Sequence, residues 1–413
     1  MNGRIYVGVD VASLEHQIEA QAESGEVLWR ARVPNTQEGC QTVVERVRVW
    51  QEEGHEVWVG LEGLGGYASP LDRLLFAAGA FVVGVHPTQA ARFRELLRVQ
   101  PDKDDRLDAG LLAEWLRWQA RNGELEPSVV RDEYFEAVRE AARAFQEATT
   151  LKVRLQNQLV HKVRIYWPDL LVGKEFFERT DAAGLLALLS QYPTPEAVVK
   201  AGVKRIEKVL REASRRDSRE LAGQLMEQAR RLAGAVPMAP ATALVVKQLA
   251  CDVADAASHV RKWEGILTQL LEQHPFGRFL LDLPGVGPRT GGCFLGEAGD
   301  LGRFEDDAKL ARYSGTAPVK VQSGKSPSRH YDGHRYNHHL KRAVLLMVRS
   351  MVQHDERSQA YTAKQRLAGK TYWQAIKKLA RYILRFLWKS WQQIVQSKAN
   401  NLDLSPAERA LLP

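Results

Sequence analysis

The segment Ile5-Tyr6-Val7-Gly8-Val9-Asp10 is an apolar run that ends on a carboxylate. Its length and its β-branched residues predict a buried strand. Residues 16–22 and 27–33 alternate between polar and apolar around a Ser-Gly turn, so they predict two more strands. A further apolar strand is predicted at 57–62, and it too ends on a carboxylate, Glu62.

Helices and one more strand complete this N-terminal part. Apolar residues recur at helical spacing in 36–53, 69–78, 88–99 and 105–118, and residues 81–85 form another apolar strand. The order β-β-β-α-β-α-β-α predicts an α/β domain over residues 1–128. Hairpin strands followed by right-handed crossovers give a mixed sheet with helices on its faces.

The remaining residues are predicted to be almost entirely helical. Long amphipathic runs at 132–166, 206–232 and 241–273 predict a helical or coiled-coil arm over residues 129–272. A long thin hairpin buries little surface by itself, so pairing with another protomer is favoured over an insertion that packs only on its own chain. Residues 273–400 predict a mainly helical C-terminal domain, with a Ser-, Gly- and Pro-rich loop region at 314–334. Residues 401–413 are predicted to be a tail.

Length and composition exclude several classes of protein. The 413 residues suggest two or three domains, and 45% hydrophobic with 26% charged residues excludes wholesale disorder. No apolar run approaches the roughly 20 residues of a membrane helix, so no membrane partner is expected. Three widely separated cysteines argue against a disulfide framework and fit a reducing cytosol. The expected location is therefore cytoplasmic.

The charge is distributed unevenly along the chain. The net charge is +8, but residues 1–130 carry 13 basic and 20 acidic residues, whereas residues 271–413 carry 23 and 12. A strongly basic C-terminal third favours a polyanionic partner, and nucleic acid is the usual one. A solvated basic surface is the alternative.

Four carboxylates in the acidic part form a candidate metal site. Asp10 and Glu62 end predicted strands, where sites collect in α/β sheets. Asp105 and Asp108 are three residues apart and would share one face of a helix. Carboxylates that converge need a hard cation, and oxygen ligands suit Mg²⁺ or Mn²⁺. The alternative for the second pair is an acidic helix start, which the helix dipole favours.

The C-terminal part contains a turn and a loop that suggest nucleic-acid contact. Gly285 and Gly287, in Pro284-Gly285-Val286-Gly287-Pro288, resemble a helix-hairpin-helix turn, whose glycines let the backbone approach a phosphate. A tight turn that needs glycines for its geometry is the alternative. Ser314 and Ser323 each precede a glycine in a loop region with many basic residues. A serine there could be a nucleophile toward a phosphodiester, but an ordinary turn serine is the favoured interpretation. The basic residues that we expect to contact phosphates are Lys325, Arg329, Arg335, Lys341 and Arg342.

Histidines and tryptophans are plentiful in this part. His338 and His339 are adjacent, so on a helix they point about 100° apart and would chelate a metal poorly. We interpret the histidine cluster as phosphate contacts. The tryptophans Trp373, Trp388 and Trp391 fit a nucleic-acid surface, but helix core is the favoured interpretation.

The ordered set of motifs resembles the DEDD insertion-sequence transposases of the insertion sequence 110 family. The resemblance covers nearly the whole chain and includes the strand ends at Asp10 and Glu62, the Asp105 and Asp108 segment, the Gly285 turn and the Ser323 loop. The additional motifs are Gly315-Thr316-Ala317-Pro318, Gly333 and Leu340-Lys341-Arg342-Ala343. Each motif is weak alone, and the order makes the set specific.

The resemblance implies both fold and activity. It implies a ribonuclease-H-like, RuvC-like first domain and a transposase C-terminal domain. It implies that Asp10, Glu62, Asp105 and Asp108 hold Mg²⁺, with Asp104 as an additional neighbouring carboxylate. It also implies that Ser323 is a catalytic serine that forms a covalent phosphoserine with DNA.

The resemblance implies partners as well. A structured non-coding bridge RNA would pair with target and donor DNA. The protein would be a homo-oligomer, a dimer or tetramer, with an active site composed from two protomers, associated with the prokaryotic nucleoid. A RuvC-type nuclease that resolves Holliday junctions by metal-dependent hydrolysis is the first alternative. A nucleic-acid-binding protein without catalysis is the second.

Overall fold

The computed structural model describes two compact units, residues 1–130 and 131–413. Within them it describes the segments 2–64, 66–97, 105–128, 132–171, 182–214, 218–234, 238–321, 329–332 and 336–400. Each unit is considered by itself.

The first unit is built on a five-stranded mixed sheet. Its strands lie in the order β3-β2-β1-β4-β5. β1 pairs antiparallel with β2 and parallel with β4, β2 pairs antiparallel with β3, and β4 pairs parallel with β5. The bounds are β1 (Asn2–Asp10), β2 (Glu15–Ala22), β3 (Val27–Pro34), β4 (His55–Glu62) and β5 (Phe81–Val85). This is the arrangement of a ribonuclease-H-like sheet, so the fold prediction is confirmed.

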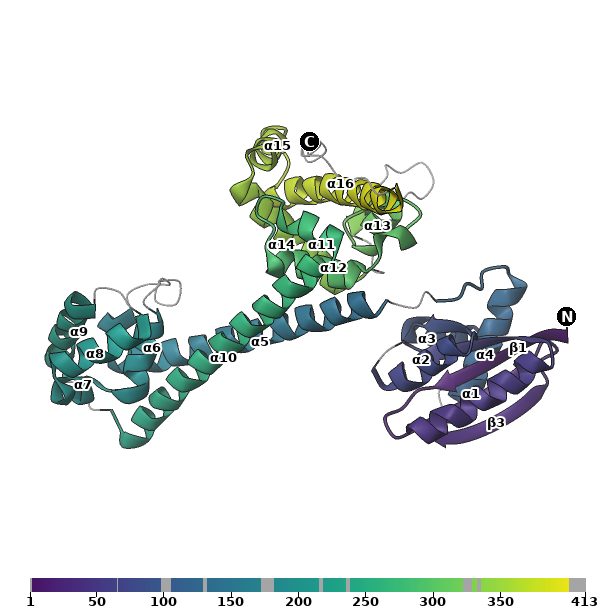
Figure 1. The fold of residues 1–413 in the computed structure, drawn as a ribbon, viewed down its shortest axis with the longest axis horizontal. Coiled ribbons are helices and arrows are strands. Elements are labelled where there is room, and N and C mark those ends of the chain that lie inside the picture. The colour runs from purple at the N-terminus through teal and green to yellow at the C-terminus, as the bar shows by residue number, and fades with distance from the viewer. Residues whose placement is uncertain are drawn as a thin grey trace. The chain divides into compact units, whose positions relative to one another are not determined.

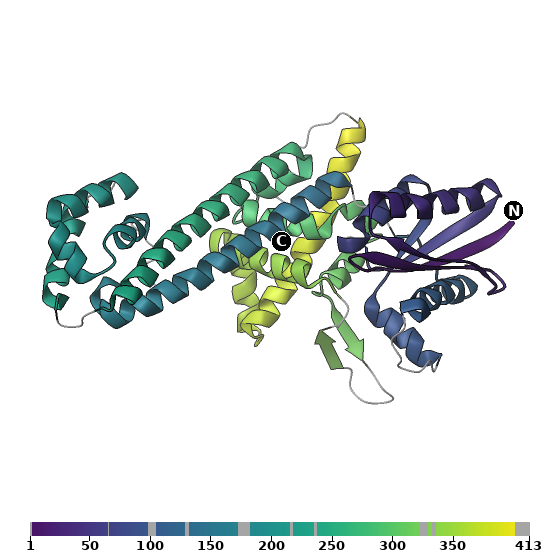
Figure 2. The same cartoon turned by 90° about the horizontal axis from the view of Figure 1, so that it is seen from below.

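Helices cover both faces of the sheet (Figure 2). Successive residues of a strand point to opposite faces. Ile5, Val7 and Val9 therefore pack in one core with the helices α1 and α2, while Tyr6 packs in another with α3 and α4. The helices are α1 (Gln37–Glu52), α2 (Ser69–Ala77), α3 (Pro87–Leu96) and α4 (Asp105–Arg121).

Gly8 lets α4 lie directly on the sheet. A Cβ atom at this position would stand 2.6 Å from the backbone nitrogen of Ala113 and 2.9 Å from the Cβ of Leu112. Real Cβ atoms do not approach backbone so closely, so any side chain would push α4 away. Gly60 on the neighbouring strand lies similarly against Leu116. Two glycines on adjacent strands thus fix the depth at which α4 sits.

Two long antiparallel helices organise the second unit (Figure 1). They are α5 (Glu133–Tyr166) and α10 (Pro240–Gln273). Asp132 caps α5 by accepting a hydrogen bond from the Tyr134 N–H at 2.7 Å, and Pro240 occupies the first turn of α10. The Tyr134 hydroxyl donates to the Leu270 carbonyl at 2.8 Å, which joins the start of α5 to the end of α10.

A separate hydrophobic core lies at each end of this helix pair. One core joins the last turns of α5 to α6–α9, and the other joins the first turns of α5 to the C-terminal helices. The first set is α6 (Ala182–Gln191), α7 (Pro195–Ala201), α8 (Val203–Ser214) and α9 (Ser218–Leu232). The second set is α11 (Pro275–Leu281), α12 (Pro288–Ala298), α13 (Asp307–Tyr313), α14 (His338–His354), α15 (Glu356–Leu367) and α16 (Tyr372–Asn400). The prediction of a mainly helical remainder is confirmed.

Two sequence-based details differ from the structure. The single helix expected at 206–232 is two helices, α8 and α9. The loop region expected at 314–334 contains a pair of short antiparallel strands, β6 (Pro318–Val321) and β7 (Arg329–Asp332). Strands of only four residues, Pro-Val-Lys-Val and Arg-His-Tyr-Asp, lack the longer apolar run on which strand recognition depends. Within the described residues, no helix combines the length and apolar character needed to cross a membrane.

Candidate active site

Asp10 and Glu62 stand at the ends of neighbouring parallel strands. The register pairs Gly8 with Gly60 and Val9 with Leu61, so the two acidic residues come next on β1 and β4. Adjacent strands lie about 4.8 Å apart, which brings both carboxylates to the same edge of the sheet. Both residues are partly exposed, whereas Val9 and Leu61 before them are fully buried. The predicted convergence of these two strand ends is present.

The start of α4 lies at that same edge. Gly8 packs beneath Ala113, and at the other end of α4 the Arg121 guanidinium donates to the Glu23 carbonyl at 3.3 Å. Since Glu23 follows the end of β2, which pairs with the beginning of β1, α4 runs opposite to β1. The first turn of α4, with Asp105 and Asp108, is therefore directed toward the carboxyl ends of β1 and β4.

Asp108 already has a cationic partner in the structure. Its Oδ1 pairs with a guanidinium nitrogen of Arg94 from α3, and both side chains are partly buried. The Asp105 backbone begins α4, but its side chain, like Asp104, lies outside the described residues. Sequence reasoning missed Arg94, because nothing in the sequence separates it from the other arginines around it.

The donor set suits a hard divalent cation. Carboxylate oxygens at a strand edge are the ligands that Mg²⁺ and Mn²⁺ prefer. Among the side chains that the structure describes, no three His, Cys, Asp or Glu residues gather as a metal-binding group. The described geometry thus brings two strand-end carboxylates together and directs the start of α4 toward them. Asp10, Glu62, Asp105 and Asp108 as a complete ligand set remain a prediction.

The predicted nucleophile Ser323 lies outside the described residues, as do Lys325 and Arg335. The strands that precede and follow the serine in the sequence are described: β6 pairs antiparallel with β7, and Val321 lies opposite Arg329 (Figure 2). Of the predicted phosphate contacts, Arg329 lies in β7, and Lys341 and Arg342 lie in the first turns of α14.

The base of this strand pair is attached firmly to the helical core. The Ser314 hydroxyl, fully buried, donates to the Ala311 carbonyl at 3.0 Å and contacts the Thr316 hydroxyl at 3.0 Å. On the other side of the pair, the Asn337 N–H donates to the Tyr313 carbonyl at 2.8 Å. Both ends of the serine-bearing segment are therefore anchored at the end of α13.

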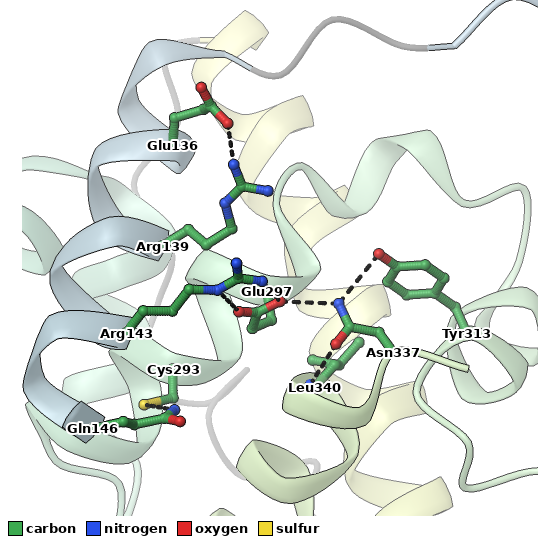
Figure 3. Close-up of polar contacts among 9 residues, drawn as sticks. All are labelled: Glu136, Arg139, Arg143, Gln146, Cys293, Glu297, Tyr313, Asn337 and Leu340. Atoms are coloured by element: carbon green, nitrogen blue, oxygen red, sulfur yellow. Dashed lines mark hydrogen bonds and ion pairs between the residues drawn. The ribbon is translucent and has the colours of Figure 1, made fainter. Parts of the chain in front are cut away.

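A buried carboxylate on α12 reinforces this anchor (Figure 3). Glu297 is 2% exposed and accepts from the Arg143 Nε at 2.8 Å and from the Asn337 side-chain amide at 2.9 Å. Asn337 also caps α14, because its Oδ1 accepts from the Leu340 N–H at 3.0 Å. Burial alone would raise the pKa of Glu297, but the hydrogen bonds from Arg143 and Asn337 and the positive charges of Arg143 and His339 lower it below 4.5. Sequence reasoning missed this group, since Arg143 and Glu297 are far apart in the chain.

Glu297→Gln is expected to destabilise the protein by about 2 kcal/mol at neutral pH, because it removes a charged hydrogen-bond acceptor from Arg143. The pKa of the folded carboxyl is lowered, so this stability is present above the unfolded value near 4.5 and is lost as pH falls through the folded pKa. Urea unfolding of variant and parent at a series of pH values should show curves that converge only below 4.5.

A suitable control is Glu140→Gln, which changes an exposed carboxylate on α5, the helix that carries Arg143. Its effect should stay within about 0.5 kcal/mol at every pH. A pH-independent difference between Glu297→Gln and the parent would show that packing, and not the charge, is what Glu297 contributes.

The Gly285 turn connects α11 to α12 as predicted. Gly285 has φ of 75°, and a Cβ there would stand 2.7 Å from the Ser350 carbonyl of α14. The Gly287 N–H donates to the Thr290 hydroxyl at 3.2 Å. Close packing and a positive φ thus account for Gly285, whereas a Cβ at Gly287 would meet nothing within 4 Å. Contact of either glycine with a phosphate remains a prediction.

Comparison with known proteins gives matches over most of the chain. A family model described as Transposase, for DEDD transposases of IS110, matches residues 7–168. A second, described as Transposase IS116/IS110/IS902 family, matches residues 277–363. Together they include the strand-end carboxylates, the start of α4 and the serine segment.

Curated relatives span nearly the same length as this chain. The insertion element IS116 uncharacterized 44.8 kDa protein of Streptomyces clavuligerus is 26% identical over 390 residues, which are 93% of this chain and 94% of that protein. The insertion element IS900 uncharacterized 42 kDa protein of Mycobacterium paratuberculosis is 26% identical over 392 residues, 93% and 94% of the two chains. The mini-circle putative transposase for IS117 of Streptomyces coelicolor is 26% identical over 88% of each chain.

Among solved structures, the chain is similar to T. thermophilus RuvC in complex with a Holliday junction substrate. The identity is 19% and the TM-score 0.23, over 30% of this chain and 99% of that one.

Proposed function

The chain belongs to the IS116/IS110/IS902 family of transposases, and from that premise we propose that it cuts and rejoins DNA strands through a covalent serine intermediate. The observation that carries the proposal is the edge where Asp10, Glu62 and the start of α4 come together, in a chain that also carries a serine loop on an anchored strand pair. Capture of a protein–DNA adduct after denaturation tests it.

The metal is proposed to be Mg²⁺, with Mn²⁺ able to replace it. Asp10, Glu62, Asp105 and Asp108 would hold it, and when bound it would neutralise charge on the scissile phosphate. Arg94 pairs with Asp108 and so supplies positive charge at this carboxylate. The chain's contribution is to hold its carboxylates at one sheet edge through strand register and the glycine-mediated seat of α4.

The serine step conserves the energy of the phosphodiester bond. The Ser323 Oγ would form a bond to phosphorus while the bond from phosphorus to the 3′ oxygen breaks. The serine proton passes to a base, and the leaving oxygen becomes a 3′ hydroxyl. Attack by the 3′ hydroxyl of the exchanged strand reverses the step and restores the serine. Direct hydrolysis would lose the bond energy, so rejoining would need another energy source.

The active site is proposed to be composite, within a dimer or tetramer. The carboxylates belong to the first compact unit and the serine segment to the second. The second unit offers surface for self-association, since the ends of α5 and α10 remote from the C-terminal core expose the apolar side chains of Ile165, Leu244 and Val245. Exposed apolar side chains on a helix pair favour burial against another protein chain.

A structured non-coding RNA is proposed to guide the choice of target and donor DNA. The basic C-terminal third supports a polyanionic partner, and RNA is a polyanion as DNA is. Base pairing would read sequence, while the protein binds backbone and shape. The complex is proposed to act in the cytoplasm, at the nucleoid.

Protein purified from its native host is expected to carry one discrete RNA, which sequencing of the nuclease-protected fraction would identify. Washing at high salt should leave this RNA bound longer than bulk RNA, because a folded partner makes more simultaneous contacts. Recovery of only heterogeneous RNA, removed completely by the wash, would count against guidance and leave the proposed chemistry unaffected.

Metal-dependent hydrolysis by a RuvC-type nuclease is the second candidate. One observation favours it: the strand-end carboxylates and α4 belong to a compact unit that has its own hydrophobic cores. Metal-dependent hydrolysis at these carboxylates would need no serine from the second unit. In that case Ser323 would have no chemical role, and no adduct would form.

A further inference from the structure

A basic groove crosses the second unit over three helices that are far apart in sequence. A hollow of about 580 Å³ between α5 and α14 adjoins one of about 310 Å³ between α14 and α16, and Arg342 lines both. A narrow third hollow, where α12 packs on α5 and α14, is also lined by Arg342 and by Arg289. Figure 3 shows Arg143 and Gln146, two of the lining residues, on α5.

The lining is strongly and openly cationic. Arg154 on α5, Arg289 on α12 and Arg349 on α14 are all exposed. Over the described part of the chain, no carboxylate lies within ion-pair distance of any of the three. A fourth arginine of the lining, Arg143, differs from these three because it forms an ion pair with Glu297. The lining also contains one acidic residue, Glu147. Unpaired arginines from three helices in one groove create a field that attracts a polyanion.

One end of the groove carries an exposed tryptophan. Trp373, at the start of α16, is 50% exposed, and the guanidinium carbon of Arg349 lies 5.9 Å from its ring centre. The core interpretation holds for Trp391, which is 5% exposed, and for Trp388, which donates to the Phe304 carbonyl at 3.1 Å, but it is wrong for Trp373. An exposed aromatic ring beside unpaired arginines suits a sugar or base face next to phosphates.

The groove begins where the serine segment returns to the core. His338 and His339 follow Asn337 directly and line the groove, and Asn337 is the residue that anchors β7 to the end of α13. A strand reaching the serine loop would therefore pass over the first turn of α14. The turn between α11 and α12 places Arg289 in the same groove.

We infer that this groove binds the sugar–phosphate backbone of the DNA duplex that flanks the cleaved bond, without reading its sequence. Arg154, Arg289 and Arg349 are the phosphate contacts, and Trp373 closes the end of the path. The assignment of DNA as the ligand of the groove rests on the proposed function, because that function places DNA next to the serine segment. The groove engages α5 as well as the C-terminal helices, so part of the long helix pair serves nucleic-acid binding.

The test is the salt dependence of binding by the full chain. The variant Arg154→Gln, Arg289→Gln, Arg349→Gln and its parent are titrated onto a labelled DNA duplex of arbitrary sequence, without divalent cation and in a Ser323→Ala background. Removing three phosphate contacts should raise Kd roughly 10²-fold at about 0.1 M salt and make the slope of log K against log salt less steep by about 3. Circular dichroism melting checks that the exposed substitutions leave the fold intact.

The matched control removes the same charge elsewhere. Arg211, Arg219 and Arg230 are exposed on α8 and α9, at the opposite end of the long helices, and Arg211→Gln, Arg219→Gln, Arg230→Gln should change Kd less than threefold. Equal weakening by both triple variants would overturn the groove, as would an unchanged slope in the first. Loss of affinity for an RNA hairpin with DNA affinity retained would overturn the assignment to DNA. Adduct formation by the parent is measured separately, so failure of the serine mechanism is distinguishable from failure of the groove.

Discussion

Replacing Ser323 with alanine is expected to abolish the covalent protein–DNA adduct and to reduce strand exchange by at least roughly 10⁴-fold, the scale on which enzymes lose activity with their nucleophile. The physical reason is that no other group would store the phosphodiester energy. Metal-assisted attack by water can still cut the strand, but it leaves a terminal phosphate that does not rejoin. The expected product of the variant is therefore a small amount of nicked DNA without joined product.

The measurement is denaturing electrophoresis of labelled DNA after incubation with Mg²⁺. Parent protein should retain a fraction of label that migrates with protein and is released by protease. Ser326→Ala provides the matched control, because it removes a hydroxyl from the same loop and should keep at least half of the parent's adduct. An adduct of undiminished yield with Ser323→Ala would place the nucleophile elsewhere. Equal cleavage by both proteins without any adduct would favour the hydrolytic nuclease.

The sequence predicted the carboxylate edge because its signals are local. Each of the two strands is a short apolar run that ends abruptly on an acidic residue, and parallel pairing then places Asp10 beside Glu62. The start of α4 was predicted from helical spacing, and Gly8 explains how closely that helix approaches. These features follow from residue pattern and backbone geometry, both of which can be read along the chain.

The features that sequence did not predict arise from distant pairing. Arg143 and Glu297 lie on different helices, and neither is distinguishable from the many other charged residues of α5 and α12. The pairing of Arg94 with Asp108 was not predicted either, because it too joins side chains of two different helices. The strands β6 and β7 were missed because they are short and polar, and are recognised only by the hydrogen bonds between them. The usual burial of tryptophan predicts Trp373 in the core, but this side chain is 50% exposed at the start of α16, next to the exposed Tyr372.

Asp10→Asn and Glu62→Gln are each expected to reduce cleavage by at least roughly 10³-fold with Mg²⁺ present. The thermal stability of Glu62→Gln should change in the opposite sense. Without divalent cation, neighbouring carboxylates at one strand edge repel each other, so removing the Glu62 charge should stabilise the first unit slightly, by up to about 1 kcal/mol. With Mg²⁺ at about 100 times its dissociation constant, the parent should gain about 2.7 kcal/mol from binding, and the variants little or none.

This reversal separates a metal site from a structural role for the same side chains. A carboxylate that only capped or packed would destabilise the protein when neutralised, with or without Mg²⁺. Glu56→Gln is the matched control, since Glu56 lies on the same β4 at the opposite edge of the sheet and pairs with Arg4. It should respond to Mg²⁺ and to EDTA as the parent does. Full cleavage by Asp10→Asn, or an undiminished stabilisation of that variant by Mg²⁺, would mean that the strand-end carboxylates are not the metal ligands, whatever the outcome at Ser323.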